Sequence, residues 1–119
     1  ITWKIKHVPK ESDYLIERTG TRTVATTDPG KKCVYLSEDL RGPFKLRVFI
    51  HELSHCALFS FNLLKDIHRM VAPEYWIEAE EWICNYIADY GQMIFDIAYE
   101  TLGYEAIWEI PGEIEKMIA

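Results

Sequence analysis

The sequence lacks the features that mark membrane, secreted and disordered proteins. No apolar run approaches the roughly 20 residues of a membrane span, and residues 1–6 lack the apolar stretch of a signal peptide. Only six glycines and five prolines occur in 119 residues, with no repeat or low-complexity segment, which excludes disorder as the dominant state. We therefore expect a cytoplasmic protein with no membrane partner. The chain begins at Ile1 and not at Met, so the sequence leaves open a trimmed fragment and a lost leader.

The chain also lacks an excess of positive charge. It has 13 basic and 19 acidic side chains, for a formal net charge of −6 at pH 7, and the basic residues are scattered. Affinity for a phosphate backbone comes largely from clustered Lys and Arg. This composition therefore excludes nucleic acid as the main partner.

Cysteine is scarce, at three residues, and no two of them have the CxxC spacing of a zinc knuckle or redox motif. An odd, widely spaced set also excludes a disulfide framework. We expect Cys33, Cys56 and Cys84 to be reduced and buried as small apolar side chains. Cys56 follows His55 directly, so on a helix it would project about 100° away from that histidine, toward the core.

What is present is an ordinary globular composition, with 49% apolar residues and a length that suits one compact domain over residues 1–119. Residues 1–5 alternate between apolar and polar at the period of a strand. An Asp-Pro-Gly turn at 28–30 predicts a hairpin over residues 22–37. These patterns predict an α+β fold in which a small N-terminal antiparallel sheet is followed by two long helices and a short C-terminal helix.

The first long helix is expected over residues 43–61, because proline is favoured at a first helical position. We expect one stripe of this helix to be buried, made of Leu46, Ile50, Leu53 and Ala57 and widened by Phe49, Cys56 and Phe59.

Further helices are expected downstream. Residues 63–72 are compatible with a helix that ends before Pro73. The second long helix is predicted over residues 74–102, with Gly103 as its stop. A last amphipathic helix is predicted over residues 113–119.

Residues 51–55 form an HExxH motif inside the first predicted helix. His51 and His55 lie four residues apart on one helix face, so both imidazoles can bind one Zn²⁺ at about 2.0–2.1 Å. Glu52 points to the adjoining side, where its carboxylate can hold a metal-bound water as the catalytic residue. We therefore expect one zinc ion per chain. The alternative is that both histidines form local hydrogen bonds on the helix face, with Glu52 in a surface ion pair.

A catalytic zinc site of this kind needs a third protein ligand and keeps its fourth position for water. The extended HExxHxxGxxH motif is excluded, because Leu58 and Phe61 stand where it needs glycine and histidine. The other common solution is a glutamate on a later helix.

The second long helix offers candidate glutamates. We favour Glu81, because Asn85 follows one turn later and Ala88 keeps this helix face narrow where helices approach. Glu78 is the second candidate and Glu80 the third. The alternative for these carboxylates is a solvated acidic face near the start of the helix, where they complement the helix dipole.

Residues of about 33 to 90 resemble the ImmA/IrrE-type zinc metallopeptidases, whose pattern is HELGH followed by E-x-x-A-N-x-F-A. Ser54 and Cys84 replace the usual glycine and alanine of that family. After the second motif, residues 89–93 replace the Leu-Leu-Met-Pro-like segment of that family. This exchange changes the wall of the substrate cleft beside the metal site. The segments that carry the resemblance are 34–37, 48–55 and 81–88.

The resemblance implies a zincin-like fold with His51, His55 and Glu81 as zinc ligands and Glu52 as general base. It also implies a zinc-dependent endopeptidase that cleaves a protein partner, such as a repressor or another regulator, often in phages and mobile elements. The alternative function is a zincin-fold binding or regulatory module with a structural or vestigial zinc site and no proteolysis. The small size of the chain favours that alternative, because no separate substrate-recognition domain is present. The weakest alternative is an ordinary α+β interaction domain with a coincidental HExxH motif.

Two parts of the expected mechanism stay open in the sequence. The nearest candidates to stabilise an oxyanion are Tyr86, Tyr90 and His68. Residues 33–37 could form an edge strand that pairs with an extended substrate, or a plain interior strand. The order of the strands decides between these two roles.

Overall fold

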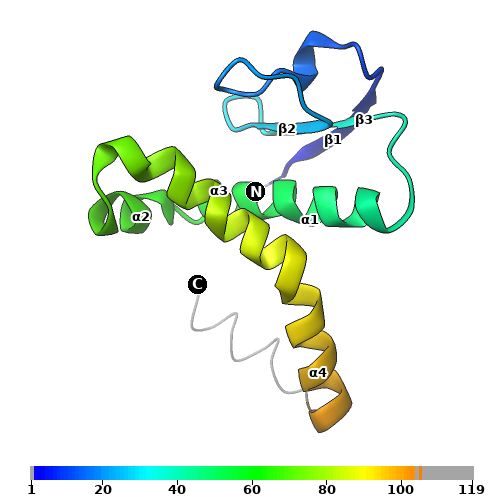
Figure 1. Ribbon diagram of the computed structural model, residues 1–119, viewed down its shortest axis with the longest axis vertical. Helices are drawn as coiled ribbons and strands as arrows, with labels where there is room; N and C mark the ends of the chain where they lie inside the picture. Colours follow the sequence, from blue (N-terminus) through cyan, green and yellow to red (C-terminus); the bar gives the residue numbers. More distant parts are fainter. Residues whose placement is uncertain (1, 104, 106–119) are drawn as a thin grey trace. The chain divides into compact units, whose positions relative to one another are not determined.

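A computed structural model describes residues 2–103 and residue 105 (Figure 1). A small sheet is followed by helices, which confirms the α+β class. The chain forms two compact units, residues 1–88 and residues 89–119. All residues predicted to bind zinc, and the predicted catalytic Glu52, lie in the first unit. The helix predicted over residues 113–119 lies outside the described residues.

The sheet has three strands in the order β1-β3-β2, namely β1 (Lys4–Val8), β2 (Ala25–Asp28) and β3 (Cys33–Ser37). The predicted hairpin is confirmed, because β2 and β3 are antiparallel neighbours. The prediction of a fully antiparallel sheet is wrong, because β1 pairs with β3 in parallel. Alternation at period two identifies a strand but carries no information about the direction of its neighbour.

The central strand β3 forms the core of the sheet, since all five of its residues are buried. Val34 and Leu36 point to one face, where they join a buried cluster with Val48 and Cys56 of the first helix. The other face packs against Leu15 of a short 3₁₀ helix, Asp13–Leu15. The edge-strand role considered for residues 33–37 is therefore wrong, and β1 and β2 are the edges of the described sheet.

Helix α1 (Gly42–Ser60) packs beneath the sheet and closely matches its predicted bounds (Figure 1). The predicted buried stripe is wrong: Leu46 and Leu53 are exposed, as is Ala57. The buried residues are Val48, Glu52, Ser54, Cys56 and Leu58. Apolar side chains surround much of this helix, so its sequence does not tell which face meets the sheet.

Three shorter elements complete the first unit: α2 (Leu64–Met70), a 3₁₀ turn (Pro73–Tyr75) and α3 (Trp76–Tyr86). Helix α2 ends before Pro73, as predicted. A third buried cluster joins α1, α2 and α3 through Leu58, Ile67 and Cys84.

The second long helix predicted over residues 74–102 is divided. A π-helical turn, Ile87–Gly91, follows α3 and precedes α4 (Gln92–Leu102). The predicted stop is confirmed, because Gly103 follows α4 with a φ of 58° that favours glycine. Among the described residues, no helix is both long and apolar enough to cross a membrane.

Replacement of Leu36 by alanine tests the core. Leu36 is 2% exposed in the central strand, so Leu36→Ala should lower the free energy of unfolding by about 2–5 kcal/mol through lost burial and a residual cavity. Leu46→Ala, on the exposed face of α1, is the matched control and should change it by about 0.5 kcal/mol or less. Urea unfolding followed by circular dichroism measures both, and equal losses would contradict the observed orientation of α1.

Candidate metal centre

Helix α1 places the two motif histidines one turn apart on the side that faces α3. Their side chains are only 12% and 11% exposed for His51 and His55. The two Nε2 atoms lie 3.1 Å apart. The predicted spacing therefore brings both imidazoles to one point in space.

Helix α3 supplies the carboxylate at that point. Glu81 Oε2 lies 3.2 Å from His51 Nε2, and Glu81 Oε1 lies 3.1 Å from His55 Nε2. In a tetrahedral zinc site with bonds of 2.0–2.1 Å, ligand atoms are about 3.3 Å apart. The three side chains thus form a group that could hold a metal ion. Glu78, the second candidate for this position, is exposed.

Contacts between α1 and α3 hold this arrangement. Cys84 is fully buried between the helices, where it packs with Leu58 of α1. Arg47 donates to the Asn85 side-chain oxygen at 3.1 Å. Asn85, one turn after Glu81, therefore has a partner on α1. All three cysteines are buried and free of disulfides, as predicted.

Glu80, the third candidate ligand, approaches a different atom. Its Oε2 lies 2.6 Å from Nδ1 of His55, on the opposite edge of the ring from Nε2. Burial opposes ionisation of this carboxyl, but hydrogen bonds from His55 and Arg18 lower the pKa of Glu80. Glu80 therefore faces inward without joining the three converging donor atoms.

Arg18 reaches the same carboxylates from the other side of the site. Its Nη2 lies 3.1 Å from Glu80 Oε2 and 3.1 Å from Glu81 Oε1. The loop that carries it is held by Glu17, whose carboxylate accepts hydrogen bonds from the backbone N–H groups of Thr19 and Thr21 at 3.1 and 2.9 Å. A guanidinium thus joins the sheet side of the unit to α3.

Glu52, the predicted catalytic residue, is buried and faces the sheet. Its carboxylate accepts a hydrogen bond from the Thr27 hydroxyl on β2. Because Glu52 directly follows His51, its carboxylate lies on the adjoining side of the helix, as the motif predicts. The edge strand therefore contacts the residue beside the candidate metal ligands.

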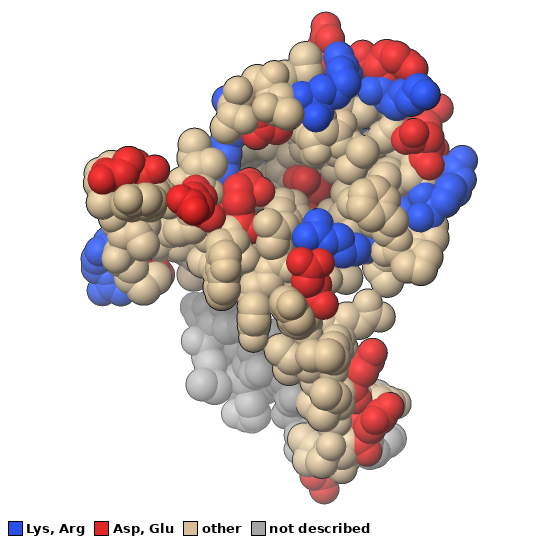
Figure 2. Space-filling view, viewed as in Figure 1, with Lys and Arg blue, Asp and Glu red and all other residues tan. Residues whose placement is uncertain are grey.

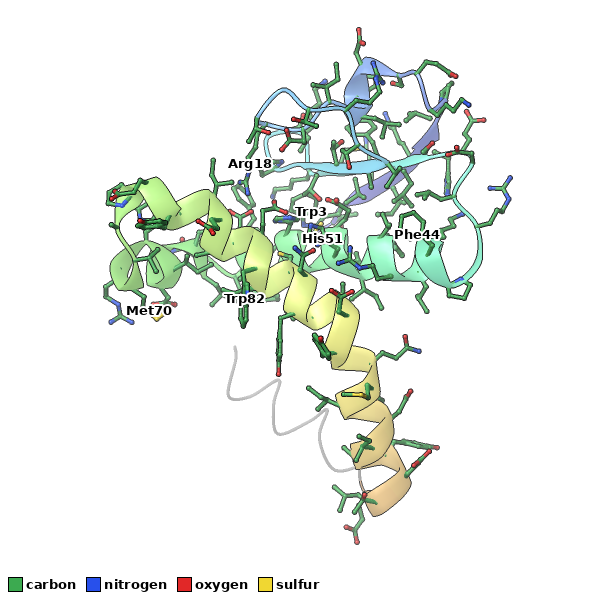
Figure 3. The ribbon with its side chains drawn as sticks, viewed as in Figure 1. Trp3, Arg18, Phe44, His51, Met70 and Trp82 are labelled. Carbon is green, nitrogen blue, oxygen red and sulfur yellow. The ribbon has the colours of Figure 1, made fainter. Side chains whose placement is uncertain are left out.

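These residues line one cleft of about 950 Å³ between the sheet side and the helices. Figure 2 shows a hollow at this place with acidic side chains along its margin. Arg18 and His51 lie on the side of α3 that faces the sheet, whereas Trp82 projects from its other side (Figure 3). His51, Glu52, His55, Glu80 and Glu81 line the helical wall of the cleft.

The electrostatics of the cleft favour positive charge between the carboxylates. Burial opposes a charged imidazole at His55, but the neighbouring polar groups of Cys84, Glu80 and Glu81 outweigh it and raise the pKa of His55 to about 12. Burial likewise opposes ionisation of Glu81, yet hydrogen bonds from His51 and His55 hold the pKa of Glu81 well below its usual range. A divalent cation would supply the same positive charge at the same place.

Two of the predicted oxyanion donors, Tyr86 and His68, do not line the cleft. Tyr86 stacks with Trp82, with ring centroids 5.5 Å apart. His68 stacks with Trp76 at 4.0 Å, and Tyr90 belongs to the second unit. Of the cleft-lining side chains, Arg18 is the cation that contacts the ligand group.

Two residues of the cleft carry no signal in the sequence. Arg18 is one basic residue in a polar loop, 63 positions before Glu81, and Thr27 is one of several β-branched residues in its strand.

No family model, curated protein or solved structure matches the chain. The geometry of the chain's own residues therefore carries the assignment of the site.

Zinc binding tests the convergence of the three donors. The wild-type protein should retain about one zinc ion per chain after dialysis, and His55→Ala should lose it because the remaining donors no longer enclose the ion. His68→Ala is the matched control, since it removes an imidazole from outside the cleft. Elemental analysis measures both, and equal zinc contents in the two variants would contradict the site.

Metal affinity should rise with pH. The raised pKa of His55, about 12, leaves the imidazole protonated at neutral pH, whereas a metal ligand must be neutral. One proton should therefore leave for each ion bound, and the apparent affinity should rise about tenfold per pH unit from about pH 6 to about pH 8. Competition with a chromophoric chelator measures the slope, and calorimetry in buffers of different ionisation enthalpy counts the protons. An affinity independent of pH would contradict the protonated state of His55.

Proposed function

We propose that the chain is a zinc-dependent endopeptidase that hydrolyses peptide bonds in a protein partner. The observation that carries this proposal is the convergence of His51, His55 and Glu81, with donor atoms 3.1–3.2 Å apart, beside the carboxylate of Glu52. Two imidazoles and one carboxylate suit zinc, and three protein ligands leave a fourth position for water or substrate. The resemblance to ImmA/IrrE-type metallopeptidases supports the same ion and suggests a regulator as the partner.

Each residue has a defined chemical role in this proposal. When bound, zinc would lower the pKa of a water molecule and polarise the scissile carbonyl. Glu52 takes a proton from the attacking water and passes it to the leaving amine. The Thr27 hydroxyl donates a hydrogen bond to one oxygen of Glu52. This hydrogen bond fixes the direction of the carboxylate.

The free edge of strand β2 is a second argument for a peptide substrate. Ser37 donates its backbone N–H to the Val24 carbonyl at 2.9 Å. Because hydrogen-bonded pairs alternate in an antiparallel ladder, the backbone groups of Ala25 and Thr27 point to the outer side of β2. An extended peptide that pairs there would lie in the cleft beside Glu52. The substrate-pairing role weighed for residues 33–37 thus passes to β2.

Glu52→Gln separates zinc binding from hydrolysis. The amide keeps the shape of the side chain but cannot take a proton, so the variant should bind zinc normally and lose about 10²- to 10⁴-fold in cleavage rate. Glu38→Gln, at an exposed position, is the control and should cleave like the wild type. The substrate is a proteome-derived peptide library. Mass spectrometry identifies the new peptide termini that each variant produces in the presence of zinc and in the presence of a chelator.

Two results would overturn the proposed activity. Equal cleavage by wild type and Glu52→Gln would exclude Glu52 as the general base. A zinc-loaded wild-type chain that produces no chelator-sensitive termini from the library would favour the binding-module alternative.

A further inference from the structure

His51 and His55 differ in how the far side of each ring is held. His55 Nδ1 lies 2.6 Å from Glu80 Oε2, whose side chain is 10% exposed. His51 Nδ1 is buried and has no hydrogen-bond partner among the described residues. A polar contact on the far side of the ring therefore orients His55 and not His51.

A neutral imidazole carries its proton on one nitrogen and a lone pair on the other. If Nδ1–H of His55 donates to Glu80, the lone pair of Nε2 points toward His51 and Glu81. Carboxylates that accept from the distal N–H of a metal-bound histidine fix its tautomer and ring orientation. The contact observed at Glu80 has this geometry.

We propose that Glu80 is a positioning residue that holds His55 in the orientation and tautomer required to bind the metal ion. This inference rests on the proposed metal site. It assigns to Glu80 a role distinct from the adjacent Glu81: one carboxylate meets the metal position, and the other meets the far nitrogen of a ligand.

Arg18 holds Glu80 in turn. Its Nη1 lies 3.2 Å from Glu80 Oε1 and its Nη2 lies 3.1 Å from Glu80 Oε2, so the guanidinium contacts both carboxylate oxygens. A paired guanidinium and carboxylate have a defined relative orientation. The positive charge also offsets the repulsion between the adjacent carboxylates Glu80 and Glu81. A series of contacts thus links Arg18 to Glu80 and Glu80 to His55.

The polar contacts of His55 divide between its two ring nitrogens. His51 and Glu81 contact His55 through Nε2, the atom that must face the metal. The hydrogen bond at Nδ1 remains available to hold the ring while Nε2 binds an ion. Removal of the Glu80 carboxylate should therefore weaken metal binding even though all three ligands remain.

The test measures affinity for Zn²⁺, by competition with a chromophoric chelator, in the wild type and three variants. Glu80→Ala should weaken binding by about 10- to 100-fold, the usual effect of losing such a partner. Glu80→Gln should lose less, because its amide oxygen can still accept from Nδ1–H. Glu78→Gln is the matched control: it removes a charge from the same helix at an exposed position and should stay within about twofold of wild type.

The absorption spectrum of bound Co²⁺ distinguishes positioning from ligation. If Glu80 positions His55, the Glu80→Gln protein saturated with Co²⁺ should show the wild-type spectrum at a higher metal concentration. A changed spectrum at saturation would mean that Glu80 is itself a ligand and would overturn the proposal. Urea unfolding of each variant without metal verifies the fold, and Arg18→Gln provides a second route to disturb Glu80 if Glu80→Ala does not fold.

The remaining outcomes are decisive as well. Wild-type affinity in Glu80→Ala, or an equal loss in Glu78→Gln, would overturn the positioning role and leave the proposed zinc site intact. Failure of the wild type itself to bind Zn²⁺ would overturn the proposed function and this inference together. The two failures are therefore distinguishable.

Discussion

The approach of α3 to α1 is the contact on which the candidate site depends. Cys84 is fully buried at this interface and packs with Leu58. Because Glu81 lies three residues before Cys84, nearly one helical turn, its carboxylate reaches the imidazoles at 3.1–3.2 Å. Small side chains permit this close approach, whereas a bulky residue at position 84 would separate the helices and the three donor atoms. The metal geometry is thus a consequence of helix packing.

Charge is the second constraint, because the carboxylates of Glu52, Glu80 and Glu81 lie on one wall of the cleft. Their partners come from two segments: Glu52 contacts Thr27 on β2, whereas Glu80 and Glu81 share Arg18 from the preceding loop. The sheet side thus supplies the donors and the helices supply the acceptors. Part of the net charge of −6 is therefore concentrated in the cleft, where a divalent cation would be stabilised.

Features set by short-range periodicity were predicted well. The four-residue spacing of His51 and His55 dictates a shared helix face, and the proline after Gly42 marks the start of α1. Glu81 was preferred to Glu78 because Asn85 and Ala88 follow it on the same helix face, and the structure brings Glu81 and not Glu78 to the imidazoles. The direction of strand pairing and the buried face of α1 were predicted poorly. The parallel pairing of β1 and the exposed stripe of α1 depend on contacts between segments distant in the chain.

The sequence by itself determined which residues could bind a metal ion, because helical geometry converts a spacing of four into a shared face. It also determined the hairpin, the boundary before Pro73 and the stop at Gly103. Only the tertiary structure decided that Arg18 contacts Glu80 and that β2 is the edge strand beside the site. The physical reason is that these contacts join segments whose separation in sequence carries no periodic signal. Their geometry exists only once the sheet and the helices have packed.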